Sequence, residues 1–264
     1  MKQAVLYVCH GSRLPKALQE AISFIEKCQK RIPADIHEIS FLELATPSIR
    51  EGFRACVEKG ATHIAVVPLL LFSANHAKVD IPHEIRQLKG QFPFIKVTYG
   101  QPIGVHEKMA EIVIERIKQS FKVEQIEPMS KVILIGRGST DEDAARDFQK
   151  IAHLVQQLSG ISSVKTCYLH AAEPSFEDVL KQDTIQREVT RNIYFVPYLL
   201  FTGLLMKEIE RKVRHAKQIN PHIHLCRYLG YDVKTEEVFI ERVIEAMVNQ
   251  NKTKKIEILS FDWT

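Results

Sequence analysis

The chain has 264 residues, of which 45% are hydrophobic and 26% are charged. These proportions are typical of globular proteins and exclude an intrinsically disordered or collagen-like chain. The formal net charge of +4 is too small to indicate a nucleic-acid-binding protein. It is compatible with a local basic patch that binds an anionic small molecule.

The apolar segments disfavour a membrane span, and the cysteines indicate a reducing compartment. The longest nearly apolar run, residues 64–72, contains Pro68 and is too short to cross a bilayer. The opening MKQAVLYVCHGSR is typical of a buried first strand rather than a signal peptide. We therefore expect a cytoplasmic protein with neither a membrane nor a nucleic-acid partner. The cysteines, scattered and without a C-x-x-C motif, agree with a reduced chain; they are Cys9, Cys28, Cys56, Cys167 and Cys226.

Short apolar runs alternate with longer amphipathic segments in the first half. In one such segment, Ile22, Ile25 and Cys28 recur at a spacing of three, which is the periodicity of a helix face. Strand–helix alternation predicts an α/β fold, with a parallel-type sheet flanked by helices. The predicted strands are 4–9, 36–44, 64–70 and 95–100, and the predicted helices are 14–31, 47–59, 76–90 and 105–120.

The same pattern restarts at residues 132–136. The tail 251–264 is expected to add a short terminal strand. The further predicted strands lie near 162–169, 191–197 and 222–227, and the further helices near 141–159, 174–182, 202–219 and 234–250.

Direct comparison of the two halves indicates a duplication. VLYVCHGS at 5–12 matches VILIGRGS at 132–139, and VPLLLFSANHAK at 67–78 matches VPYLLFTGLLMK at 196–207. ATPS at 45–48 likewise matches AEPS further on, and the matches keep their order and nearly their offset. The sequence therefore predicts two tandem domains of similar fold, 1–124 and 125–264, joined in the polar segment 121–130.

Three polar side chains follow three different strands of the first half. They are His10, Glu43 and His76. Ligands of open parallel sheets bind outside the carboxyl ends of the strands, so these residues are expected to converge. Two imidazoles and a carboxylate can bind a divalent metal or accept protons near neutral pH. Taken singly, each residue is also explained as a loop histidine or as a carboxylate at the start of a helix.

The second half differs at these three positions. It carries Arg137, His170 and Leu205 where the first half has His10, Glu43 and His76. The glycine, serine and proline framework is present in both halves, whereas the histidine pair occurs in one. We therefore expect a single metal site, located in the first half.

Residues beside the same strand ends are candidates for binding an anionic ligand. Ser12 follows Gly11 and can cap a helix whose exposed amides bind a carboxylate. Arg13, Lys78 and Arg137 can pair with ligand carboxylates, although any one of them is also explained as a solvated surface cation. Neither G-x-G-x-x-G nor a P-loop occurs, which disfavours a nucleotide cofactor.

The stretches YVCHGSR, LELATPS and VVPLLLFSANHAKVDIP resemble the class II tetrapyrrole chelatases. More narrowly they are similar to the sirohydrochlorin chelatases, which insert iron on the way to sirohaem or cobalt on the way to cobalamin. The resemblance covers nearly the whole chain, because double-length members contain two such halves, and the iron-inserting members of bacilli are the most similar.

This resemblance implies a metal chelatase, a lyase that takes sirohydrochlorin and Fe²⁺, or possibly Co²⁺, as substrates and holds no permanent cofactor. It implies that His10 and His76 are the catalytic residues and bind the metal, with Glu43 as a further ligand. The substrate-binding candidates are then Ser12, Arg13, Lys78 and Arg137. Since Arg137 and Leu205 depart from the pattern, the second half is expected to form the opposite wall of one cleft.

Three alternatives remain open at this point. The cobalt-inserting enzyme uses the same ligand types, so the motifs do not separate it from the iron enzyme. A two-lobed carrier would hold a metal or a tetrapyrrole without turnover. A periplasmic two-lobed binding protein would need a signal peptide. Because two lobes are already fused in one chain, we expect a monomer.

Overall fold

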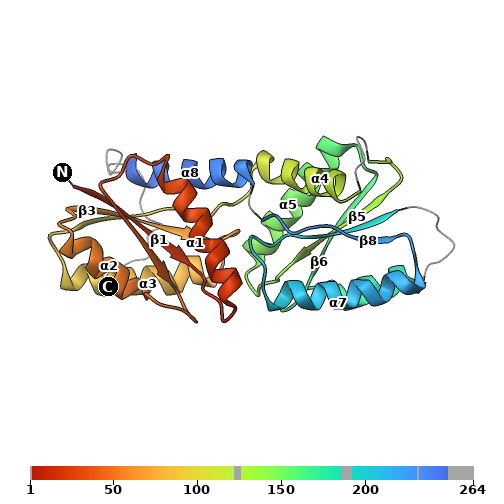
Figure 1. The fold of residues 1–264 in the computed structure, drawn as a ribbon, viewed down its shortest axis with the longest axis horizontal. Coiled ribbons are helices and arrows are strands. Elements are labelled where there is room, and N and C mark those ends of the chain that lie inside the picture. Colours follow the sequence, from red (N-terminus) through yellow and green to blue (C-terminus); the bar gives the residue numbers. More distant parts are fainter. Residues whose placement is uncertain (1, 122–125, 186–191, 231, 249–264) are drawn as a thin grey trace.

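A computed structural model describes residues 2–121, 126–185, 192–230 and 232–248, and it contains two four-stranded parallel sheets side by side (Figure 1). The first sheet has the order β2-β1-β3-β4 and the second the equivalent order β6-β5-β7-β8. The predicted α/β fold with two similar repeats is therefore confirmed. The strands are β1 Gln3–Cys9, β2 Ile36–Phe41, β3 His63–Leu69, β4 Lys96–Tyr99, β5 Lys131–Gly136, β6 Ser163–Tyr168, β7 Ile193–Pro197 and β8 Ile223–Leu225.

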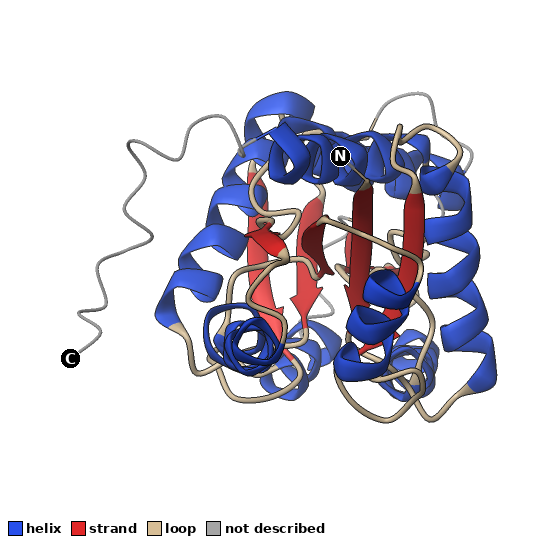
Figure 2. Ribbon diagram, turned by 90° about the vertical axis from the view of Figure 1, so that its left-hand side faces the viewer, coloured by secondary structure: helices blue, strands red, loops and turns tan. Residues whose placement is uncertain are grey.

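Helices cover both faces of the sheets (Figure 2). Because of this cover, every residue of the central strands β1 and β5 is buried, which explains why these strands are apolar on successive residues. The expected terminal strand at 251–264 lies outside the described residues. The helices are α1 Pro15–Gln29, α2 Ile49–Glu58, the π-helix η1 His76–Asp80, α3 Ile81–Gln91, α4 Glu107–Phe121, α5 Glu142–Ser159, α6 Phe176–Ile185, α7 Leu204–Ile219 and α8 Val233–Val248.

Local capping fixes where several helices begin and end. Ser48 starts α2 with a capping box, in which its hydroxyl accepts from Glu51 N while the Glu51 carboxylate accepts from Ser48 N. The Asp141 side chain caps α5 by accepting from Asp143 N. Gly160 ends α5 at φ 69°, in the left-handed region that glycine adopts without strain. These signals set the elements that lead to and from the strand ends.

The last helix of each half packs on the other half. α4 follows β4 of the first sheet but lies against α5 and β7, whereas α8 follows β8 of the second sheet but lies against α1, β3 and β4 (Figure 1). Ring contacts mark both crossings, with Phe24 of α1 against Phe239 of α8 and Phe121 of α4 against Tyr194 of β7. One hydrophobic core consequently runs through both lobes.

Two further cores belong to one lobe each. The first lies under α2 and α3, and the second lies under α6 and α7. The division of the sequence into 1–124 and 125–264 stays a prediction, since packing mixes helices from the two halves. No helix within the described ranges is long and apolar enough to cross a membrane.

A buried arginine holds the crossing together. Arg116 of α4 donates from Nε to the carbonyls of Tyr228 and Leu229, at 3.1 and 3.0 Å, and from Nη2 to Asp232 Oδ2 at 3.0 Å. Its side chain is only 4% exposed. The acceptors lie in the segment that carries the chain from β8 back to α8. Arg116 therefore ties α4 to the start of the returning helix.

We predict that Arg116→Met lowers the free energy of unfolding by about 3 kcal/mol, because it leaves Asp232 and two buried carbonyls without their donor. Urea unfolding of the purified protein measures this value. Lys118→Met is the matched control on α4, because no ion pair of Lys118 is found with the described residues, and it should change stability by less than about 0.5 kcal/mol. Equal stabilities of the two variants would contradict the role of Arg116.

Candidate metal centre in the cleft between the lobes

A cavity of about 860 Å³ lies where the carboxyl ends of the strands of both sheets meet. Its volume is within the range of small-molecule sites. Residues of the first lobe, among them His10 and His76, form one wall, and residues of the second lobe, among them Arg137 and His170, form the other. The sequence prediction placed the site at this position in the fold.

The structure brings His10, Glu43 and His76 together. One ligand atom of each residue lies within 4.8 Å of the others. The His10 and His76 rings are 5.0 Å apart in a T-shaped arrangement, and His10 Nε2 lies 3.3 Å from Glu43 Oε1. Two ligands bound at about 2.0–2.1 Å to a tetrahedral ion are about 3.3 Å apart, so this spacing suits a first-row metal.

The backbone holds His10 beside Glu43. Gly11 has a φ of 96°, and a Cβ at this position would lie 1.8 Å from the Glu43 carbonyl oxygen. Glu43 N in turn donates to the His10 carbonyl at 3.1 Å. Leu44, the next residue, has a φ of 61°, which is uncommon for a residue with a branched side chain. Glycine is thus required for the close approach of the two loops that carry the ligands.

His76 begins the π-helix η1, which has a wider turn than an α-helix. Its Nδ1 lies 2.7 Å from Asp80 Oδ2, one turn further along. Because a carboxylate accepts from an N–H, Asp80 favours the tautomer with hydrogen on Nδ1 and leaves the Nε2 lone pair of His76 for a metal. The spacing of four between His76 and Asp80 was visible in the sequence, but sequence reasoning did not single out Asp80.

The π turn inserts one residue into the first lobe. Lys78 and Lys207 are related by an offset of 129, whereas the buried Ile81 and Ile209 that follow them are related by 128. The second lobe therefore reaches the same packing register through an ordinary α-helix. Single π turns inside helices often occur at functional sites, and here the extra residue lies in the turn that carries His76.

Arg137 reaches across the cleft to His10. Its Nη1 donates to His10 Nε2 at 2.9 Å, while His10 Nδ1 lies 3.3 Å from the Gly11 carbonyl. Burial and, next, the Arg137 guanidinium lower the pKa of His10 below its usual value, against smaller opposite effects of Gly11 and Glu43. The imidazole is thus neutral at neutral pH, and a metal that binds Nε2 replaces the Arg137 hydrogen bond.

The other predicted ligand-binding residues have different surroundings. Ser12 and Arg13 line the cavity, and the Ser12 hydroxyl accepts from Leu14 N at 3.1 Å. The Lys78 ammonium is bound instead to Asp141 and Asp143 of the second lobe, at 2.7 Å from each. Sequence reasoning missed these two aspartates, because an ion pair between lobes leaves no spacing signal.

The second lobe offers no equivalent metal site among the described residues. His170 and Leu205 line the cavity at the positions that match Glu43 and His76, and no other cluster of potential metal ligands is found in the described part of the chain. The scaffold is nevertheless repeated, since a Cβ on Gly138 would lie 1.7 Å from the His170 carbonyl oxygen. At these two loops the lobes therefore differ in side chains rather than in backbone.

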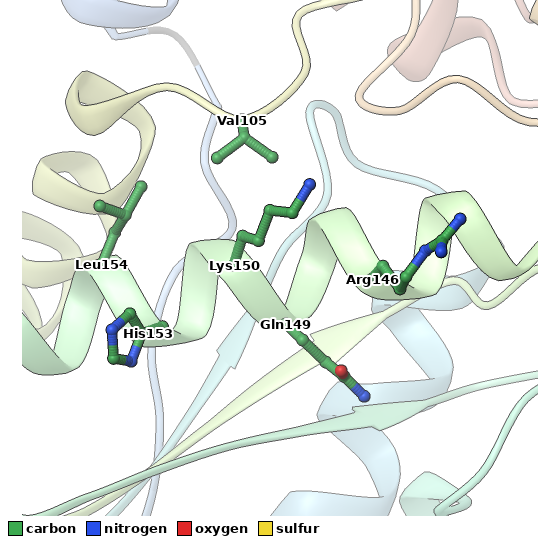
Figure 3. Close-up of a pocket in the computed structure, with 6 residues that line it drawn as sticks. All are labelled: Val105, Arg146, Gln149, Lys150, His153 and Leu154. Carbon is green, nitrogen blue, oxygen red and sulfur yellow. The ribbon is translucent and has the colours of Figure 1, made fainter.

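A second, shallower hollow of about 580 Å³ lies away from His10, Glu43 and His76, between α5 and the segment that carries Val105 (Figure 3). Its cations are neutralised nearby, Arg146 by Asp143 and Lys150 by Asp147. In Figure 3 the Gln149 side chain points away from Val105. The hollow presents no convergent set of polar groups, and we assign it no role.

The fold and the site are those of a two-lobed α/β protein. Its cleft carries a set of nitrogen and oxygen donors that can bind a metal ion. The model of the CbiX family matches residues 4–120 and again residues 131–246. The chain belongs to the CbiX family and contains two copies of its domain.

Relatives are similar over nearly the whole chain. A sirohydrochlorin ferrochelatase of Bacillus subtilis is 45% identical over 250 residues, which are 94% of each chain. A sirohydrochlorin cobaltochelatase of Priestia megaterium is 32% identical over 254 residues, 95% of this chain and 82% of that protein. The solved structure of SirB from Bacillus subtilis with Fe³⁺ superposes with a TM-score of 0.87 at 44% identity, covering 96% of this chain and 98% of the other.

We predict that Arg137→Gln raises the pKa of His10, because it removes a cation whose charge disfavours protonation. A histidine NMR titration of the metal-free protein measures this pKa, and His10 of the wild type should protonate at lower pH than His10 of the variant. Lys207→Gln, which also removes one cation of the second lobe but not the contact with His10, is the control. An unchanged titration in Arg137→Gln would contradict the electrostatic coupling between the lobes.

Proposed function

We propose that this protein is a sirohydrochlorin ferrochelatase, a lyase that inserts Fe²⁺ into sirohydrochlorin to give sirohaem. The observation that carries the proposal is the donor set His10, Glu43 and His76 on one wall of a cleft between two lobes. Membership of the CbiX family and 45% identity to a Bacillus subtilis sirohydrochlorin ferrochelatase support it.

The reaction sets requirements that these residues can meet. The ring exchanges two pyrrole N–H protons for one Fe²⁺, without any change in oxidation state. Bound through His10, Glu43 and His76, the ion has lost part of its water shell and keeps open positions for pyrrole nitrogens. Glu43 offsets part of the positive charge before the ring nitrogens take over the ion.

Proton acceptance is the second requirement. As Fe²⁺ passes to the ring, the Nε2 lone pairs of His10 and His76 become free to accept the two protons. Asp80, hydrogen-bonded to Nδ1 of His76, orients that ring and leaves its Nε2 free for the incoming proton. Arg137 is 2.9 Å from Nε2 of His10 and opposes protonation there, so it must move away before His10 accepts a proton.

The walls of the cleft suit a flat macrocycle with eight carboxylate arms. Most of the lining is apolar, and the cations Arg13 and Arg137 are among the lining residues. We assign Ser12, Arg13 and Arg137 to the carboxylates, because they line the cavity. Lys78 can join them only by leaving Asp141 and Asp143.

Cobalt insertion is the second candidate function, favoured by the 32% identity to a Priestia megaterium cobaltochelatase. Fe²⁺ and Co²⁺ are neighbours in their affinity for nitrogen and oxygen ligands. The higher identity to the iron enzyme favours iron. Product analysis with both ions present discriminates the two, and an excess of the cobalt product would favour the second candidate.

We also propose that the protein acts as a monomer in the cytoplasm. All five cysteines are free and buried, which agrees with a reducing compartment. Both walls of the cleft come from one chain. Light scattering coupled to size-exclusion chromatography tests the oligomeric state.

We predict that His10→Ala and His76→Ala each lower the rate of sirohydrochlorin metallation by at least about 100-fold, because each removes a metal ligand and a proton acceptor. Absorption changes on addition of Fe²⁺ to sirohydrochlorin and protein measure the rate. His83→Ala, on the exposed side of α3, is the control and should keep the wild-type rate. Near wild-type rates in both test variants would contradict the assigned roles.

A further inference from the structure

Three cations form an exposed row on α7, which we call the α7 stripe: Lys207, Arg211 and Arg214. Their spacings of four and three residues place them on one face of the helix. None of the three makes an ion pair or a side-chain hydrogen bond with the described residues. On the neighbouring flank, by contrast, Lys212 is bound to Glu177 and Glu208, and of these two acids Glu208 also interacts electrostatically with Arg211.

The stripe begins at the cleft. α7 starts where the two lobes meet and runs outward along the second lobe (Figure 1). Its first residues, Leu204 to Met206, line the cavity, and Leu204 is 64% exposed. At 1.5 Å per residue, Lys207 is about 5 Å, Arg211 about 10 Å and Arg214 about 15 Å along the helix axis from Leu204. The cations therefore lead from the bulk solvent to the cavity.

The position of Lys207 is unfavourable for the helix itself. A cation in the first turn opposes the helix dipole, and α7 has no acidic residue there to compensate. Among helices α1 to α8, only α1 and α7 lack an acid in the first turn, and both begin at the cavity. α5 also reaches the cavity, but its Asp141 and Asp143 are bound by Lys78. The first turns of α1 and α7 thus carry no acid that would repel an anionic ligand, whereas α5 keeps the exposed Glu142.

We propose that the α7 stripe is a capture surface for the carboxylate arms of the incoming tetrapyrrole, outside the cavity itself. This inference rests on the proposed function, which supplies an octacarboxylate substrate. The Debye length, beyond which the interaction between exposed charges is largely screened, is about 8 Å at physiological ionic strength. Lys207 and Arg211 therefore bind arms of a ring that is entering the cleft, Leu204 contacts its apolar face, and Arg214 attracts the ring from further out.

The test compares two triple variants with the same change in net charge. One replaces Lys207, Arg211 and Arg214 by glutamine. The control replaces three exposed cations that do not line the cavity, Arg54, Lys89 and Lys165, by glutamine. Stopped-flow fluorescence of sirohydrochlorin mixed with the metal-free protein, at low and at high salt, gives the association rate constant, and thermal unfolding checks the fold of both variants.

We expect association of the stripe variant at low salt to be about 10-fold slower than wild type, with a weaker dependence on salt. The control should stay within about twofold of wild type, and Lys207→Gln alone should slow association more than Arg214→Gln alone. Equal rates and equal salt dependence in the stripe variant and the control would overturn the inference while leaving the proposed function intact. A wild-type protein that does not bind sirohydrochlorin would overturn both.

Discussion

The exchange of α4 and α8 between the two halves is the constraint on which the rest of the structure depends. Each of these helices completes the cover of the other half's sheet, so one hydrophobic core extends through both lobes. The lobes are therefore not independent units that meet at a surface. Arg116, buried at the crossing, extends the same coupling with polar contacts.

Near the cleft, too, each lobe packs side chains against the other. Phe72 of the first lobe stacks on Tyr198 of the second at 5.6 Å, and Phe201, its counterpart in the repeat, packs on Phe24 of the first lobe at 5.9 Å. Each lobe thus sends one aromatic side chain into the other. With the shared core, these contacts fix the spacing of the two walls that carry the candidate metal ligands and Arg137.

The two repeats supply similar walls, which differ in their side chains and in one π turn. The close approach at Gly11 recurs at Gly138, and the unusual φ of Leu44 recurs at Ala171. The π turn that carries His76 has no counterpart in α7. The first lobe combines ligands for a cation, while the second supplies Arg137 and, by our proposal, a basic approach along α7. Within one cleft, the groups that bind the metal thus lie on the first lobe, and the groups that attract the anionic ring lie on the second.

The sequence was informative where strand ends and repeats determine geometry. His10, Glu43 and His76 each follow a strand of one parallel sheet, so their convergence could be predicted from the sequence alone. The exchange of α4 and α8 could not be predicted in this way, because the sequence pattern of alternating strands and helices does not depend on which sheet a helix covers. The contacts of Arg137 with His10 and of Lys78 with Asp141 also depend on that exchange, since they join residues of different lobes.

We propose that one metal ion binds between His10, Glu43 and His76 on the first lobe. Anomalous diffraction from crystals soaked in Co²⁺ tests it most directly. We expect one strong anomalous peak within bonding distance of His10 Nε2, His76 Nε2 and the Glu43 carboxylate, with the Arg137 guanidinium displaced from His10. A peak at other residues, or a filled site with the Arg137–His10 hydrogen bond still in place, would contradict it.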